Sequence, residues 1–177
     1  MKAVARGKAW KFGDDLTVDK DILPFHYLRE LAGRVPLEDL ACHLMEPLRP
    51  EFGKKARKGD FLVAGKNFGL GKAHSIAVEA MKILGLSAII ADSVASGFFP
   101  KAIYYALPML TGERVSEKIR QGDELEVNLE TGEIRNLSSG KVLHADPAVP
   151  PGHPLFPIMK AGGQIEYIRQ KVLSNKR

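Results

Sequence analysis

Five side chains that could bind an anion or transfer a proton lie close together near the middle of the chain. They are Lys66, Asn67, Lys72, His74 and Ser75, and glycines separate them. Lysine, asparagine and serine donate hydrogen bonds to anions, and histidine exchanges protons near neutral pH. One function that this spacing allows is a loop that binds a carboxylate or phosphate.

The elements around this loop are predicted to be a strand before it and a helix after it. Residues 61–64 form a short apolar run after a turn signal at residues 58–60, which favours a buried strand. From Ser75, apolar residues recur at helical spacing until Gly85, which indicates a helix with a glycine stop. N–H groups at a helix start favour anions. A lone Gly-x-Gly can also serve only to turn the chain, so the residues alone leave both interpretations open.

The remaining periodicity predicts an α/β fold. Residues 87–91 resemble a second buried strand, and the strand, helix, strand order implies a parallel sheet with a right-handed crossover. Residues 125–129 and 134–137 alternate apolar and polar types around a turn, as in a β-hairpin. We also expect a strand at residues 3–12 and one closing helix at residues 157–171. Together these predict one domain over residues 1–177 with a small mixed sheet.

Composition sets bounds on the class of protein. The chain has 177 residues, which is the usual size of one domain, and its hydrophobic content of 45% is ordinary for a globular core. The longest apolar stretches fall short of a membrane span, and no apolar signal core follows the first basic residues. We therefore expect a cytoplasmic protein without a membrane partner.

The sequence shows no pattern of residues that is typical of a metal site. Cys42 is the single cysteine, so the chain cannot form an internal disulfide or hold an iron–sulfur cluster, which needs several thiolates. His144 and His153 fit no zinc spacing. The acidic residues between positions 14 and 21 lack the glycine and the closing glutamate of a calcium loop. We expect no metal and no cofactor in this chain, and any cluster must sit on another chain.

The formal net charge is +5. Basic residues are scattered apart from a cluster at residues 54–58 and the tail at residues 171–177. No recognition motif with interleaved aromatic residues accompanies them, so a solvated surface is favoured over nucleic-acid binding. A basic surface would also steer dicarboxylate or tricarboxylate anions to the protein.

Several blocks in the same order resemble one protein family, and they span almost the whole chain. They are residues 10–15, 22–24, 43–46, 49–52, 58–60, 64–69, 87–91 and 161–167. The family is the small (swivel) subunit of the isopropylmalate dehydratase and homoaconitase branch of the aconitase superfamily. The resemblance implies a swivelling β/β/α domain and a hydro-lyase that dehydrates and rehydrates a 2- or 3-hydroxy di- or tricarboxylic acid. It also implies a partner, an iron–sulfur large subunit whose [4Fe–4S] cluster acts as a Lewis acid.

The chain departs from this family inside the loop. The family usually continues Gly-x-Gly-Ser-Ser-Arg-Glu-His-Ala, in which a serine is the catalytic base and the arginine grips a substrate carboxylate. This chain instead has Lys72, His74 and Ser75 near those positions, and two further family arginines are missing around residues 94–101. We therefore take these three residues as the candidates for the catalytic groups. The candidate substrate-binding groups in the loop are Lys66, Asn67 and the backbone amides of Gly69, Leu70 and Gly71.

Residues 25–30 resemble a mobile loop that, in the family, covers the substrate side chain and helps to select the substrate. Arg29 lies in this segment. A guanidinium pairs bidentately with a carboxylate. The resemblance therefore implies that Arg29 binds an acidic or polar substrate tail.

Two other functions stay open at this point. A non-catalytic paralogue would keep the fold and the partner surface but lose the chemistry, and the replaced loop positions make this credible. An RNA-binding regulator would rest on the weak basic signal alone. The retained Lys66, Asn67, Gly69 and Gly71, together with polar replacements, favour an active hydro-lyase with a changed substrate.

Overall fold

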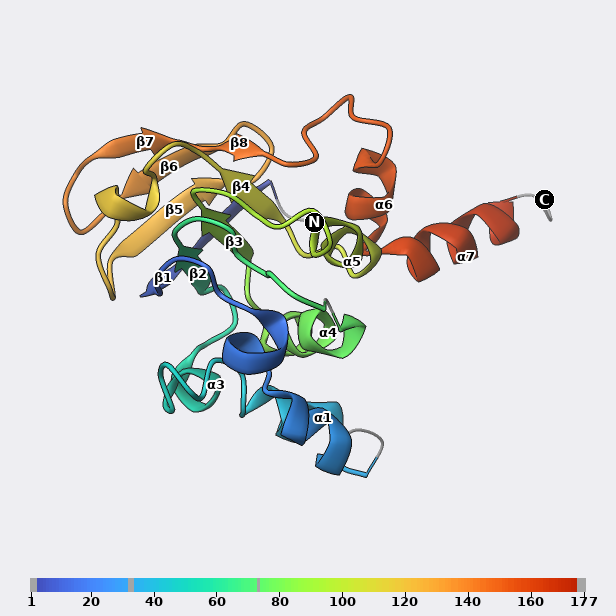
Figure 1. The fold of residues 1–177 in the computed structure, drawn as a ribbon. Helices are drawn as coiled ribbons and strands as arrows, with labels where there is room; N and C mark the ends of the chain where they lie inside the picture. The colour runs from blue at the N-terminus through green and yellow to red at the C-terminus, as the bar shows by residue number, and fades with distance from the viewer. Residues whose placement is uncertain (1–2, 32–33, 73, 175–177) are drawn as a thin grey trace.

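A mixed β-sheet organises the molecule (Figure 1). The computed structural model describes residues 3–31, 34–72 and 74–174. Within them the strand order is β7-β6-β5-β1-β2-β3-β4-β8. The strands are β1 (Val4–Lys11), β2 (Phe61–Ala64), β3 (Ala88–Ala91), β4 (Met109–Thr111), β5 (Glu124–Asn128), β6 (Glu133–Asn136), β7 (Val142–His144) and β8 (Asp146–Pro147). β1 to β4 are parallel, whereas β5 to β7 and β8 pair antiparallel, so the predicted α/β fold with a mixed sheet is confirmed.

Helices pack mainly on one face of the parallel strands, apart from α7. The helices are α1 (Phe25–Leu31), α2 (Leu37–Ala41), α3 (Phe52–Lys55), α4 (Ser75–Leu84), α5 (Phe99–Tyr104), α6 (Phe156–Ala161) and α7 (Gln164–Ser174), with a π-helical turn at Val18–Ile22 and a 3-10 turn at Ser116–Lys118. In Figure 1, α1, α3 and α4 lie together on one side, and the antiparallel strands lie on the other. Among the described residues, no helix combines the length and apolar composition needed to cross a bilayer.

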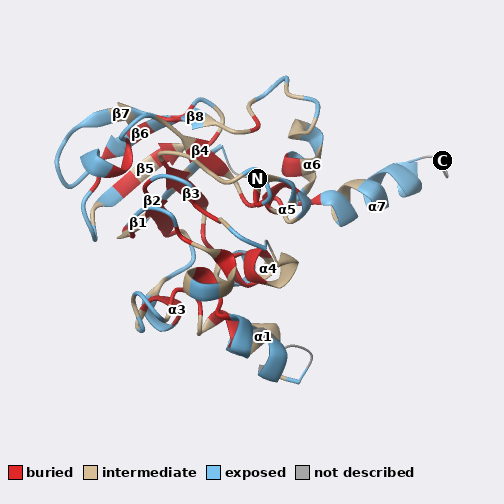
Figure 2. Cartoon of the chain, viewed as in Figure 1, coloured by how far each residue is buried: buried red, intermediate tan, exposed pale blue. Residues whose placement is uncertain are grey.

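β2 and β3 are buried on both faces, which explains their unbroken apolar runs. Leu62 and Ile89 belong to the core under the helices, where Met81 of α4 packs. The alternate residues Phe61 and Ile90 belong to a second core against the antiparallel strands. Figure 2 shows buried residues on both sides of the central strands. The glycine loop thus follows a strand that two cores hold in place.

The predicted strand–loop–helix unit is confirmed at both ends. β2 spans Phe61–Ala64, and α4 begins at Ser75 and ends at Gly85, which adopts a left-handed conformation with φ of 85°. The predicted hairpin is also confirmed, since β5 and β6 pair antiparallel.

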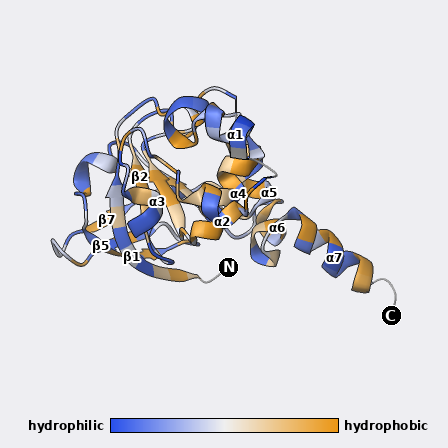
Figure 3. Ribbon diagram, turned by 90° about the horizontal axis from the view of Figure 1, so that it is seen from below, coloured by the Kyte–Doolittle hydropathy of each residue, from blue (hydrophilic) through white to orange (hydrophobic). Residues whose placement is uncertain are grey.

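Two predictions about helices are wrong. The closing segment is not one helix, because Gly162 and Gly163 have φ values of 97° and 128° and separate α6 from α7. None of the residues of Gln164–Ser174 is buried, and α7 extends away from the body with apolar and polar positions mixed along it (Figure 3). Residues 25–30 are helical rather than a loop, as α1 begins directly after the buried Pro24.

Candidate functional site

The glycine loop, residues 65–75 with Ser75 as the first residue of α4, lies at the carboxyl edge of the parallel strands, and Ala73 falls outside the described residues. Loops that follow β1 and β3 flank it, because those strands are its neighbours in the sheet. Ligands of open α/β sheets commonly bind at this edge. The loop has two parts with different environments, a first part at residues 65–70 and a second part at residues 71–75.

Carboxylates and a hydroxyl from the neighbouring loops hold the start of the first part. The Lys66 backbone N–H donates to Asp14 Oδ1 at 2.8 Å, and the Asn67 side-chain amide donates to Asp15 Oδ1 at 2.7 Å. The Asn67 backbone N–H donates to Ser93 Oγ at 2.8 Å. The Asn67 amide, predicted as a substrate donor, is thus engaged in the fold, whereas the Lys66 side chain is exposed.

The amides of Gly69 and Leu70 are also engaged. Both donate to the Leu16 carbonyl oxygen at 2.9 Å, and the Leu70 carbonyl accepts from Val18 N–H at 2.9 Å. Each of these two amides thus already has an acceptor in the fold, and their contact with an anion stays a prediction. Gly69 is required here, because its φ is 85° and a Cβ would lie 2.6 Å from the buried Phe98 ring.

The second part carries the candidate catalytic groups. Lys72 is exposed, and His74 and Ser75 are half-buried where α4 begins. The His74 side chain makes no capping hydrogen bond, and its ring lies 5.8 Å from the Phe25 ring between centroids. In the described part of the chain, these three side chains make no hydrogen bond. They are therefore free to contact a substrate, and the first amides of α4 favour an anion beside them.

Helix α1 borders the second part and is fastened to the segment after α2. Tyr27 stacks on His43 with 4.1 Å between ring centroids, and its hydroxyl donates to the Glu46 carboxylate. His43 Nδ1 lies 2.9 Å from the same Glu46 oxygen. The hydrogen bond to Glu46 raises the pKa of Tyr27 to about 12. The bonds from Tyr27 and then His43 hold the pKa of Glu46 below its usual value.

Arg29 follows Phe25 by one helical turn on α1, so both residues share a face of the helix. Its side chain is 74% exposed, and the nearest carboxylate is that of Glu30 at 3.7 Å. Among the described residues, no hydrogen bond or salt bridge joins Arg29 to the glycine loop. The His74 ring thus lies beside Phe25 at the start of α1, whereas the Arg29 side chain, one turn further along, is exposed to solvent.

A pocket of about 350 Å³ at the same sheet edge was missed by sequence reasoning. Asp92, Ser93 and Thr111 line it with apolar neighbours. Asp92 Oδ1 accepts from Ser116 N–H at 2.9 Å, and Ser93 binds the glycine loop. The available signal for this pocket was Asp92 and Ser93, which directly follow β3. Residues at this position lie beside the glycine loop, because the carboxyl ends of parallel strands lie at the same edge of a sheet.

Metal ligands do not gather in the described residues. They contain no group of three or more His, Cys, Asp or Glu side chains placed to hold a metal ion. The thiol of Cys42 is half-buried and lies 3.6 Å from the Glu38 carbonyl oxygen. These residues do not fit a cluster, which needs several thiolates.

Comparisons with known proteins extend over nearly the whole chain. A scan against family models gave no match. The chain is 40% identical to an isopropylmalate/citramalate isomerase small subunit of Methanocaldococcus jannaschii, covering 99% of this chain and 100% of that protein. It is 42% identical to a 3-isopropylmalate dehydratase small subunit of Thermotoga maritima, covering 93% and 95%. It is 41% identical to a methanogen homoaconitase small subunit of Methanothermobacter thermautotrophicus, covering 83% and 82%.

A solved structure agrees with these relatives. The crystal structure of a 3-isopropylmalate dehydratase from Methanocaldococcus jannaschii superimposes with a TM-score of 0.86 at 34% identity, covering 98% of both chains.

Proposed function

The chain belongs to the small-subunit family of 3-isopropylmalate dehydratase and homoaconitase, and from this membership we propose that it is the small subunit of a heteromeric hydro-lyase. The reaction would be the reversible removal of water from a 2- or 3-hydroxy di- or tricarboxylic acid. The names of the relatives imply a large-subunit partner, and we assign an iron–sulfur cluster to that partner. When bound there, the cluster would supply a Lewis acid for the departing hydroxyl.

The observation that carries the assignment of catalytic groups is the contrast within the glycine loop. Its first part keeps the family residues and is fully hydrogen-bonded, while Lys72, His74 and Ser75 stay free at the start of α4. We assign His74 as the base that takes the proton from the carbon beside a substrate carboxylate. Lys72 would bind that carboxylate as a point charge in place of the family arginine. Ser75 would donate a hydrogen bond from its hydroxyl.

Further anion contacts would come from the edges of the site. The exposed Lys66 ammonium and the Gly71 amide are available, unlike the engaged groups of Asn67, Gly69 and Leu70. We propose that α1 covers the substrate and that Arg29 binds its tail. The hydrogen bond of Tyr27 to Glu46 and its stacking on His43 support this, because they fix the helix that carries Arg29.

The experiment that tests the function is anaerobic co-purification with the candidate large subunit and an assay of water loss. The panel would contain malate derivatives, citrate homologues and related hydroxy acids. We expect turnover of at least one member that needs both chains. A stable complex without turnover would favour the non-catalytic paralogue, to which the replaced loop residues also point. Failure to form a complex would contradict both functions.

Arg29→Ala tests the choice of substrate in the active complex. We expect KM to rise roughly tenfold for the native acid and little for an analogue without its tail, since one charge-assisted contact is lost. Arg34→Ala is the matched control, as Arg34 is also exposed but lies beyond α1. Equal effects of Arg29→Ala on both acids would mean that Arg29 does not contact the tail.

A further inference from the structure

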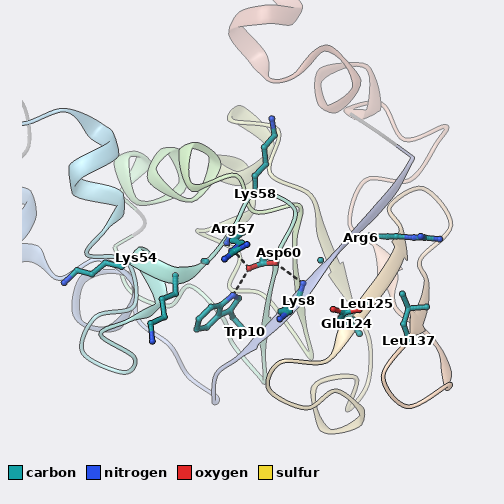
Figure 4. A pocket seen from close by; sticks show the side chains of 13 residues that line it. Arg6, Lys8, Trp10, Lys54, Arg57, Lys58, Asp60, Glu124, Leu125 and Leu137 are labelled. Atoms are coloured by element: carbon teal, nitrogen blue, oxygen red, sulfur yellow. Dashed lines mark hydrogen bonds between the residues drawn. The ribbon is translucent and has the colours of Figure 1, made fainter.

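A pocket with a mostly charged lining lies at the opposite sheet edge from the glycine loop. It has a volume of about 870 Å³ and opens where β1 extends past the start of β2 (Figure 4). We call it the basic pocket, because cationic side chains dominate its lining. These are Arg6, Lys8, Lys54, Lys55, Arg57 and Lys58.

The base of the pocket is built around Asp60, which is only 6% exposed. Its carboxylate accepts hydrogen bonds of 2.9 Å from the Lys8 N–H, the Trp10 indole N–H and the Arg57 N–H (Figure 4). These bonds tie β1 to the turn before β2 and fix the backbone that carries the cations. Because Asp60 is satisfied by three N–H donors, it does not form an ion pair with the lysines around it.

The positive charge of the pocket is largely uncompensated. Elsewhere, exposed arginines pair with carboxylates, as in Arg114–Glu117 at 2.7 Å and Arg169–Glu166 at 2.6 Å. In the part of the chain that the structure describes, only Arg6 of the six pocket cations forms a salt bridge, with Glu126. Glu124 and Asp60 are the two carboxylates of the lining. Six cations against these two carboxylates leave the lining with a net positive charge, which a bound anion would offset.

We propose that the basic pocket binds a small molecule carrying a chain of phosphate groups. Four of its six cations come from residues 54–58, so the charge is concentrated in a short span, which suits a dense anion. The volume lies within the usual range for small-molecule sites, and Leu137, 50% exposed, offers an apolar wall for an organic group. The proposal does not depend on the proposed hydro-lyase function.

A nucleic acid fits the pocket less well. The cationic surface ends at Glu124 and at the Arg6–Glu126 pair instead of continuing as a track. The one aromatic residue of the lining, Trp10, is half-buried and already packs against Phe52, 5.3 Å away between ring centroids, and beneath the Arg49 guanidinium at 6.0 Å, so it is a poor stacking platform for a base.

Calorimetric titration of the full chain at low ionic strength tests the proposal, with tripolyphosphate and ATP as probes. The pocket variant combines Lys54→Gln, Lys55→Gln and Lys58→Gln. The matched control combines Lys118→Gln, Lys141→Gln and Lys160→Gln, which are exposed lysines outside the pocket. We expect the pocket variant to bind both probes about tenfold more weakly or worse, and the control to bind like the wild type.

Thermal unfolding without a probe gives a second readout. We expect the pocket variant to unfold at a higher temperature than the control at low salt, with the difference vanishing at high salt as repulsion is screened. Equal losses of binding in both variants, no binding by the wild type, or equal unfolding temperatures would overturn the proposal. A single-stranded RNA oligonucleotide that binds the pocket more tightly than ATP would also overturn it, in favour of nucleic acid.

Discussion

The two parts of the glycine loop differ in how firmly the rest of the molecule holds them. In residues 65–70, backbone and side-chain groups bond to the loops after β1 and β3. In residues 71–75, the side chains of Lys72, His74 and Ser75 lack such bonds among the described residues. The first part matches the resembled family and the second departs from it. The residues that shape the loop thus match the family, whereas the exchanged residues are the ones proposed to contact a substrate.

The strongest test of the first part is Gly69→Ala. The left-handed conformation and the 2.6 Å approach of a Cβ to Phe98 both oppose a side chain. We expect the free energy of unfolding to fall by about 2 to 4 kcal/mol, measured by urea denaturation.

Gly71→Ala is the matched control in the second part. Its φ is 77°, but a Cβ would meet only the Asp19 carboxylate at 3.1 Å. We expect a loss of about 1 to 2 kcal/mol from backbone strain alone. Equal losses for both glycines would contradict the distinction between a packed and an open part.

Asn67→Ala should have the next largest effect. Asn67 has a φ of 55° and its side chain bonds to Asp15. We expect a loss of about 1 to 2 kcal/mol in unfolding free energy, from conformational strain and the lost hydrogen bond. Asn67→Gly removes the bond but tolerates the conformation, so it should cost less. A larger loss for Asn67→Gly would rule out strain as part of the effect.

Tyr27→Phe tests the attachment of α1. We expect a loss of roughly 1 kcal/mol at neutral pH, because the hydrogen bond to Glu46 disappears while the stacking on His43 stays. Tyr104→Phe, at an exposed tyrosine, is the control.

This effect should depend on pH in one direction. The pKa of Glu46 is lowered from 4.5 in the folded protein, so its stabilising contribution is complete above that value. The contribution is lost as the pH falls through the lowered pKa. The difference between Tyr27→Phe and the wild type should therefore shrink in acid, and a difference that grows in acid would contradict the role of Glu46.

Local signals allowed much of the fold to be predicted. β2 and α4 were predicted because an apolar run, a helical period and Gly85 mark their limits within the sequence. The break between α6 and α7 had a visible signal in Gly162 and Gly163, but the prediction carried one helix through them. α1 was missed because the resemblance implied a loop at residues 25–30.

The bonding of the site could not be predicted from local patterns. The Leu16 carbonyl oxygen accepts hydrogen bonds from the Gly69 and Leu70 amides, and the Glu46 carboxylate accepts one from the Tyr27 hydroxyl. Each bond joins segments that are distant in the sequence and meet only when the sheet forms. Lys72, His74 and Ser75 could be named from the sequence as candidate catalytic groups of the second part, and their roles stay predictions.

The smallest effect on stability is expected for His74→Ala and Lys72→Ala. Neither side chain makes a hydrogen bond or salt bridge among the described residues, so the free energy of unfolding should change by less than about 0.5 kcal/mol. A loss comparable to that of Asn67→Ala would show that these residues support the fold.

The most direct test of the account is the turnover of the complex reconstituted with the large subunit, measured for His74→Ala beside the wild type. We predict that the variant assembles and unfolds like the wild type but loses roughly 100- to 10,000-fold in kcat, as expected when a general base is removed. A reconstituted complex in which His74→Ala keeps full turnover would contradict the claim that the open part of the glycine loop carries the chemistry.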